Sequence, residues 1–210
     1  FGDPIAFEMS LGMHADRPAL DGDVKLAGTV SYDLSEEKYH VEPLDLDVVM
    51  RGKSLPGGTA TITSRARIDV DLKKGLAKIS QLSLSGLGTE LKGEIEATDI
   101  ESDAPGARGT IELQGSDLAL LFKAFDLPIA KQIGKLKKRS FNLITEFDAD
   151  MQNGDVHVPK LTGQMLGATL NATLEAQRVN TDKPAAKGSI AAKGPDLPSL
   201  LSVFGQLQGM

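Results

Sequence analysis

Apolar and polar residues alternate with a period of two along most of the chain. The clearest run covers residues 59–72, where alternate positions form two sets. One set is Ala60, Ile62, Ser64, Ala66, Ile68, Val70 and Leu72, and the other is Thr61, Thr63, Arg65, Arg67, Asp69 and Asp71. Because successive side chains of a strand point to opposite faces, this run predicts a long strand with one wet face.

The same alternation predicts strands over residues 22–34, 38–50, 59–72, 76–86, 89–99, 107–115, 139–151, 155–163, 167–178 and 186–193. Asn153-Gly154 lies between two of these runs. It is a strong hairpin signal, because a type I′ turn needs positive φ at both central positions. Long strands joined by short turns predict a mainly β fold, an antiparallel meander.

The chain also repeats itself at an offset of 79 residues, so that residues 69–125 align with 148–204 without a gap. The matches include Asp69 with Asp148, Gly75 with Gly154, Leu87-Gly88 with Leu166-Gly167, and Phe125 with Phe204. A shorter echo at an offset of 38 aligns Asp33-Leu34 with Asp71-Leu72. We therefore expect one elongated, curved domain over residues 1–210. Residues 1–58 form a partial, divergent repeat, and residues 59–136 and 139–210 form two full repeats.

Each repeat is expected to close with a short amphipathic helix. Asp117 is placed to cap the first helix, whose apolar residues continue at helical spacing to Leu136, with a kink or restart at Pro128. Asp196 begins its counterpart in the second repeat. Each helix has one apolar stripe, which we expect to cover an end or edge of the sheet.

Composition removes several classes of function. The net charge is -6, aromatic residues make up 4% of the chain and Trp is absent, which argues against a nucleic-acid partner. The absence of cysteine excludes disulfides, thiolate metal sites and cysteine nucleophiles. No stretch reaches the roughly 18 apolar residues of a membrane span. The chain begins Phe1-Gly2-Asp3 without Met, so we expect a segment of a longer precursor.

Candidate chemistry is sparse. His14, His40 and His157 are interpreted as solvated residues rather than metal ligands, and the acidic run 148–155 as a hairpin turn rather than a calcium loop. Paired acids such as Asp69 and Asp71 follow the polar parity of their strands, as solvation requires. No catalytic motif is present. We expect no enzymatic activity, no metal and no cofactor.

One basic cluster interrupts the acidic chain. Its members are Lys131, Lys135, Lys137, Lys138 and Arg139. The simplest interpretation is that they complement the negative end of the preceding helix and keep it soluble. The alternative is a patch for an anionic lipid headgroup or an acidic partner.

Two motifs resemble the AsmA-like family of bacterial envelope proteins. They are the helix openings Gly115-Ser-Asp117-Leu118-Ala-Leu-Leu121 and Gly194-Pro-Asp196-Leu197-Pro-Ser-Leu200, and the strand pair from Phe147 to Gly163. The resemblance covers about residues 69–208. It implies a periplasmic segment of a protein anchored in the inner membrane by sequence outside this segment. It also implies a role in outer-membrane biogenesis, with phospholipid or another envelope lipid and other envelope proteins as partners.

A one-sided sheet whose apolar face is left uncovered must meet lipid, a partner or another copy. The repeat singles out equivalent apolar positions as candidates for lining such a groove: Val41, Leu44, Leu46, Ile79, Leu82, Leu84, Val158 and Leu161. Two alternatives stay open. These residues form an ordinary closed core under the helices, or the chain is a structural scaffold or adhesion module with no lipid ligand.

Overall fold

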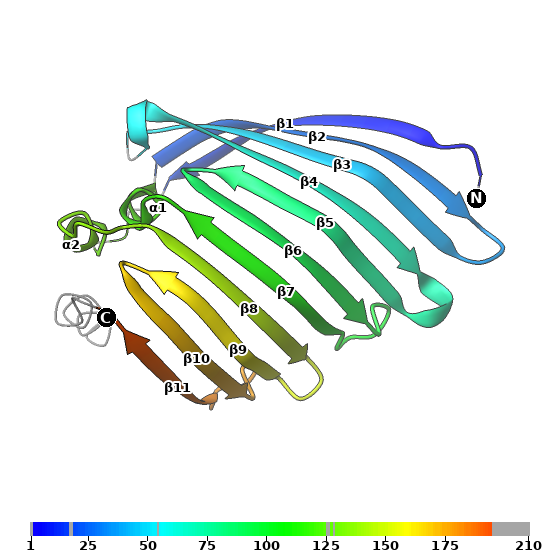
Figure 1. Cartoon of the computed structure of the whole chain (residues 1–210). Coiled ribbons are helices and arrows are strands. Elements are labelled where there is room, and N and C mark those ends of the chain that lie inside the picture. The colour runs from blue at the N-terminus through cyan, green and yellow to red at the C-terminus, as the bar shows by residue number, and fades with distance from the viewer. Residues whose placement is uncertain (1, 17–18, 54, 125–126, 128, 195–210) are drawn as a thin grey trace.

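Eleven antiparallel strands form one open sheet in the computed structural model, and their order in the sheet is their order in the sequence (Figure 1). The structure describes residues 2–16, 19–53, 55–124, 127 and 129–194. The strands are β1 (Ile5–Asp16), β2 (Ala19–Asp33), β3 (Lys38–Arg51), β4 (Thr59–Asp71), β5 (Leu76–Gly86), β6 (Thr89–Thr98), β7 (Gly106–Gly115), β8 (Phe141–Asp150), β9 (Asp155–Met165), β10 (Ala168–Gln177) and β11 (Ala185–Lys193). The predicted mainly β, antiparallel class is confirmed.

The sequence-based prediction missed the N-terminal strand. The strand prediction begins at residue 22, whereas β1 covers Ile5–Asp16 and β2 starts at Ala19. The missed signal is present in β1, where Phe7, Met9, Leu11 and Met13 share one parity. Glu8, Ser10 and Gly12 lie between them, so the alternation is regular. Ladder pairing with β2 along the whole length of β1 holds the strand in place.

Two short helices connect β7 to β8. α1 covers Leu118–Ala124 and α2 covers Ala130–Ile133, and the single-turn 3-10 helices η1 (Pro56–Gly58) and η2 (Leu72–Lys74) lie in the β3–β4 and β4–β5 connections. The backbone N–H of Ala119 donates to Asp117 Oδ1 at 2.9 Å, which gives α1 its N-terminal cap. The helix predicted from Asp196 lies outside the described residues.

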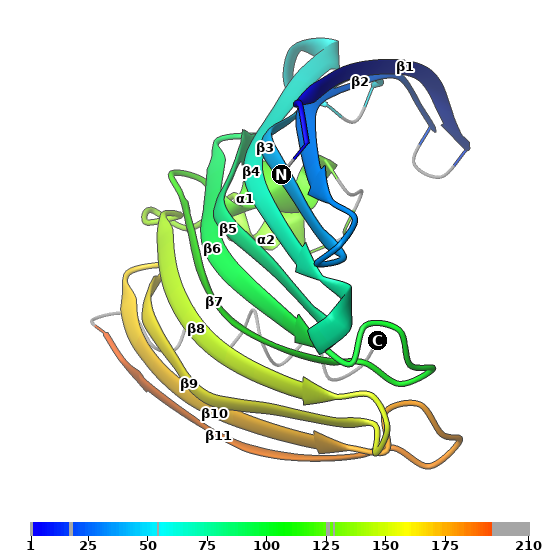
Figure 2. The same ribbon diagram turned by 90° about the vertical axis from the view of Figure 1, so that its right-hand side faces the viewer.

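The helices build the one closed core of the described chain. Leu118, Ala119, Ile129, Ile133 and Phe141 are buried together, with Leu113 and Met165 packed against them. Phe141 lies at the start of β8, so the helices cover one end of the sheet. Figure 2 shows the sheet bent into a trough, with α1 and α2 at the far end of the hollow.

Bulges and glycines accommodate the bend. Ladder pairing shifts between Val41 and Leu44 in β3, and again between Ile79 and Leu82 in β5. Such irregularities raise the local twist of a strand. Glycines allow close approach on the apolar side, where Phe rings from neighbouring strands lie over them: Phe7 over Gly28, Phe147 over Gly109 and Phe141 over Gly115.

Hydrogen bonds also join successive turns at the end of the sheet opposite the helices. The N–H of Leu72 donates to Glu37 O at 3.0 Å, and that of Ile100 donates to Gly75 O at 3.2 Å. Further along, Val179 N–H donates to Gly154 O at 2.9 Å. Each accepting residue has positive φ, so the turns share one geometry.

Candidate binding site: the apolar trough

One face of the sheet carries no charged residue at any ladder position of the eleven described strands. Residues paired across an antiparallel ladder point to the same side, so the registers assign every strand residue to a face. The polar residues on this face are Ser64, Thr89, Thr145, Tyr32 and Tyr39. The lysines, arginines and carboxylates of the strands lie on the opposite face. We call the uncharged face the apolar trough.

A single row of ladder partners crosses the whole apolar trough. It runs Met9, Leu26, Leu46, Ser64, Leu84, Leu91, Leu113, Leu143, Gly163, Leu170 and Ala192, one residue from each strand. Strands in a sheet are about 4.8 Å apart, so ten intervals give an apolar stripe ~48 Å long. Ser64 is the one hydroxyl in that stripe.

All eight groove residues predicted from the sequence lie on the apolar trough, and each is half-buried. Leu46 and Leu84 belong to the long row, through Ser64. A second row runs Ile5, Val30, Val41, Ile68, Ile79, Ile95, Gly109 and Phe147. Leu44 pairs with Ala66, Leu82 with Gly93, Val158 with Leu174 and Leu161 with Ala172. The structure therefore brings the eight together on one surface.

The apolar trough is open to solvent away from the helices. Within the described residues, no second layer covers it, and its buried strand residues are Gly22, Gly28, Ala66, Phe141, Ala168 and Leu170. The accessible surface is 13080 Å² for a mass of 22.2 kDa. A compact monomer of this mass exposes roughly 9,400 Å². A large exposed surface is what a one-layer sheet without a stacked second layer requires.

The basic cluster lies at the helix end of the apolar trough. Lys131 is in α2, and Lys135, Lys137, Lys138 and Arg139 lead from it to β8. The four lysines are exposed, whereas Arg139 is half-buried and forms an ion pair with Asp117 Oδ2 at 3.0 Å. Arg139 also donates to the carbonyl of Gly134 at 3.3 Å, near the end of α2. It therefore joins the two helices, and only the lysines form an exposed cationic patch.

The opposite face is covered by cross-strand ion pairs. Arg65 donates to Asp45 at 2.7 Å, Lys187 lies 2.7 Å from Glu175, and Arg108 pairs with Glu96. The hydrogen bond and charge of Asp45 raise the pKa of Arg65. These groups are solvated, so they contribute mainly to solubility and register.

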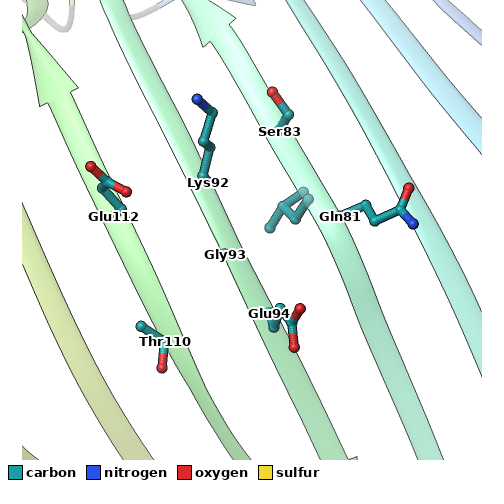
Figure 3. Close-up of a pocket in the computed structure, with 8 residues that line it drawn as sticks. Gln81, Ser83, Lys92, Gly93, Glu94, Thr110 and Glu112 are labelled. Carbon is teal, nitrogen blue, oxygen red and sulfur yellow. The ribbon is translucent and has the colours of Figure 1, made fainter.

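Figure 3 shows a hollow on this polar side, over β5, β6 and β7, with Ser83, Lys92 and Glu112 around it. It forms beside the bulge at Gln81, which has a φ of 52°. Lys92 Nζ lies 2.8 Å from Glu90, and the hydrogen bond between them raises the pKa of Lys92 and lowers that of Glu90. Of the ionisable residues around this hollow, Lys92 and Glu94 are exposed and Glu112 is half-buried.

The histidines also lie on the polar face. His40 Nδ1 is 2.7 Å from Asp69 and its Nε2 is 3.1 Å from Glu42, and Arg67 pairs with both acids. Burial raises the pKa of Asp69, but the hydrogen bonds from Arg67 and His40 lower it by more. No group of three or more His, Asp or Glu side chains in the described part of the chain is arranged to hold a metal ion.

The run 148–155, interpreted from sequence as a turn, closes on itself. Asp150 accepts from the backbone N–H of Gln152 at 2.8 Å and from the side chain of Asn153 at 2.6 Å. The hydrogen bond from Asn153 lowers the pKa of Asp150. The carboxylate therefore serves the hairpin.

Comparison with known proteins adds no assignment. The chain matches no family model, no curated protein and no solved structure. None of the described helices has the length and apolar content needed to cross a membrane. The case for function therefore rests on the geometry of the apolar trough.

Proposed function

We propose that the apolar trough binds the acyl chains of lipids. The observation that carries this proposal is the uncharged row that crosses all eleven described strands and is half-buried at nine of its eleven positions. Monomeric proteins rarely leave contiguous apolar surface larger than a few hundred Å² exposed without a use. The backbone groups of the inner strands are engaged in the ladders, so this surface offers aliphatic contact and few hydrogen bonds. Such a surface suits a ligand made of methylene groups.

The shape of the apolar trough supports chains rather than a small rigid ligand. Away from the helices the row is accessible from one side in the described part of the chain, so a chain can enter laterally and lie across several strands. Each methylene removed from water contributes about 0.8 kcal/mol. The binding free energy is thereby spread over many weak contacts, and chains of different length can be accepted.

The exposed lysines supply the headgroup part of the proposal. Lys131, Lys135, Lys137 and Lys138 lie at the helix end of the apolar trough, where an anionic headgroup would meet cations in an otherwise acidic molecule. A cation near a lipid phosphate contributes about 1 kcal/mol. We therefore assign these lysines to headgroup contact and leave Arg139 with its structural role.

The setting we propose is that of the AsmA-like envelope proteins. This chain would be a non-enzymatic, periplasmic module of a membrane-anchored protein that takes part in lipid homeostasis and outer-membrane biogenesis. Duplication of a unit of about 79 residues would have built the long face. In support, β5 (Leu76–Gly86) and β6 (Thr89–Thr98) reappear with the same bounds, shifted by 79, as β9 (Asp155–Met165) and β10 (Ala168–Gln177).

Native mass spectrometry tests the proposal. The full chain is incubated with vesicles of phosphatidylglycerol and phosphatidylcholine, re-isolated and sprayed under gentle conditions. We expect adducts with the mass of one or more intact phospholipids. Replacing the four lysines by Gln should reduce the preference for phosphatidylglycerol while leaving adducts in place. A chain that stays free of lipid at every ratio would refute the proposal and favour a structural scaffold.

A further inference from the structure

β11 (Ala185–Lys193) has a free edge, and the equivalent edge of another strand in the same sheet is paired. β11 pairs with β10 along its whole length and has no partner on its other side in the described chain (Figure 1). At an offset of 79 it is equivalent to β7 (Gly106–Gly115), which pairs with β6 on one side and β8 on the other.

The equivalence of β7 and β11 includes a side-chain contact with the preceding strand. On the paired side of each strand, a basic residue faces a glutamate of the preceding strand: Arg108 with Glu96 in β7, and Lys187 with Glu175 in β11. A hydroxyl residue is also kept at the next position of this face, where Thr110 of β7 is equivalent to Ser189, although Thr110 faces Glu94 and Ser189 Oγ lies 2.9 Å from Thr173 on β10. β11 therefore keeps the ion pair of β7 on its inner side.

The outer side of β11 lacks the aromatic packing that β8 gives to β7. In β7, the space above Gly109 and Gly115 is filled by two rings of β8, with Phe147 Cε1 3.0 Å and Phe141 Cζ 2.5 Å from where a Cβ would lie. The equivalent glycines are Gly188 in β11 and Gly194 directly after it, and their nearest neighbours in the described part of the chain are backbone and Ala168 atoms rather than a ring. An aromatic ring packed over a glycine of the neighbouring strand stabilises a strand pair.

Exposure agrees with this difference. Ile190, equivalent to the half-buried Ile111 of β7, is 79% exposed, the highest value among the exposed large apolar residues of the described chain. β11 carries lysines at both ends, which is a common protection of edges, but no proline or described bulge interrupts its free side. The edge is therefore open to another strand.

We infer that the free edge of β11 binds an antiparallel strand with the pattern of β8. Two aromatic residues six positions apart lie over Gly194 and Gly188, and an acidic residue follows the second one to face Lys187, as Asp148 faces Arg108 across the β7–β8 ladder. The added strand widens the apolar trough by one strand and covers Ile190. This inference concerns the edge of the sheet and does not depend on lipid binding.

Cysteine cross-linking tests the inference, and because the chain has no native cysteine, only the introduced thiols can form disulfides. The full chain carries Ser189→Cys, and the probe is a synthetic peptide of residues 140–151 with Glu146→Cys. Thr110 pairs with Glu146, so the two thiols should lie opposite each other. Residues opposite each other across a ladder have Cβ atoms within disulfide range. We expect a disulfide yield at least fivefold higher than with peptides that carry the cysteine at position 145 or 147.

Two controls accompany the probe. Thr173→Cys on β10 is the ladder neighbour of Ser189 on the same face but has strands on both sides, so it should show no register preference. A peptide that also carries Phe141→Ala and Phe147→Ala should be captured about tenfold less well, because it loses the burial of two rings.

A second measurement uses the native chain, so its result does not depend on whether a substituted chain folds correctly. In the native chain, an excess of the unmodified peptide should slow amide hydrogen exchange within residues 185–193. Equal yields in all registers, or unchanged capture of the alanine peptide, would overturn the inference. So would a Ser189→Cys chain that forms disulfides with its own copies in the presence of excess peptide, which would assign the edge to a second molecule.

Discussion

The substitution Leu84→Asp separates an open lipid-binding face from a closed core. Leu84 lies in the middle of the long row, paired with Ser64 on β4 and Leu91 on β6, and its side chain is half-buried. In the free chain, the new carboxylate can stay hydrated above the sheet. The loss is then about half of the burial energy of a leucine, or ~1 kcal/mol of unfolding free energy.

The expected effect on lipid binding is much larger. An acyl chain across this row would have to cover the carboxylate, and an ionised group without a partner costs several kcal/mol to remove from water. We expect binding to weaken by ~3 kcal/mol or more, which is at least about a hundredfold in Kd. A closed core predicts a different pattern, with unfolding free energy reduced by several kcal/mol.

Urea denaturation gives the stability change, and displacement of a fluorescent fatty acid gives the change in affinity. The matched control is Ser83→Asp, which places the same charge one residue away on the polar face. There, Ser83 pairs with Arg65 on β4 and Lys92 on β6, so the new carboxylate meets two cations. We expect the control to keep both stability and binding. Leu84→Asp protein that binds as well as the native chain would contradict our account of the apolar trough.

Three further predictions concern the packed end and the polar face. Phe141→Ala should cost 3–5 kcal/mol of unfolding free energy in urea, because this ring is 3% exposed at the centre of the helix-covered core; a cost below about 1 kcal/mol would mean that the helices do not depend on it. Asp117→Ala should lower stability by about 1 kcal/mol and speed amide exchange in α1, because it removes the cap and the ion pair with Arg139; unchanged exchange would argue against the cap. The hydrogen bonds to Asp21 and then Asp16 raise the pKa of His14 above 6.5, so its contribution to stability is full below pH 6.5 and is lost as pH rises through the folded pKa. An NMR titration should show the His14 midpoint return toward 6.5 in Asp21→Asn protein, and an unmoved midpoint would exclude this hydrogen bond as the cause.

The alternation of residues predicted most strands because one face of this sheet is uncharged and the other is wet. β1 was missed although Phe7, Met9, Leu11 and Met13 alternate with polar or small residues. The helical run from Asp117 to Leu136, predicted with a kink or restart at Pro128, forms in the described residues the seven residues of α1 and the four of α2. Short helices of this kind depend on packing against Phe141 and its neighbours, which sequence periodicity does not report.

The candidate site could be predicted in part. Repeat equivalence selected Val41 and Leu44, although they have opposite parity and would lie on opposite faces of a regular strand. The bulge between them places both on the apolar trough, and that bulge is visible only in the ladder. The long row could not be predicted from the sequence either, because it depends on the register of each of the ten strand pairs.

The order of the strands has a consequence for how the molecule folds. Every described strand pairs only with its neighbours in sequence, so each step of assembly closes a short loop, except the step from β7 to β8, which spans the two helices. Local contacts of this kind favour fast folding, and in repeat proteins they allow structure to spread from any nucleus. We therefore expect the sheet to grow strand by strand and to unravel from its two ends. In hydrogen exchange, protection should rise from the outer strands towards β5 and β6.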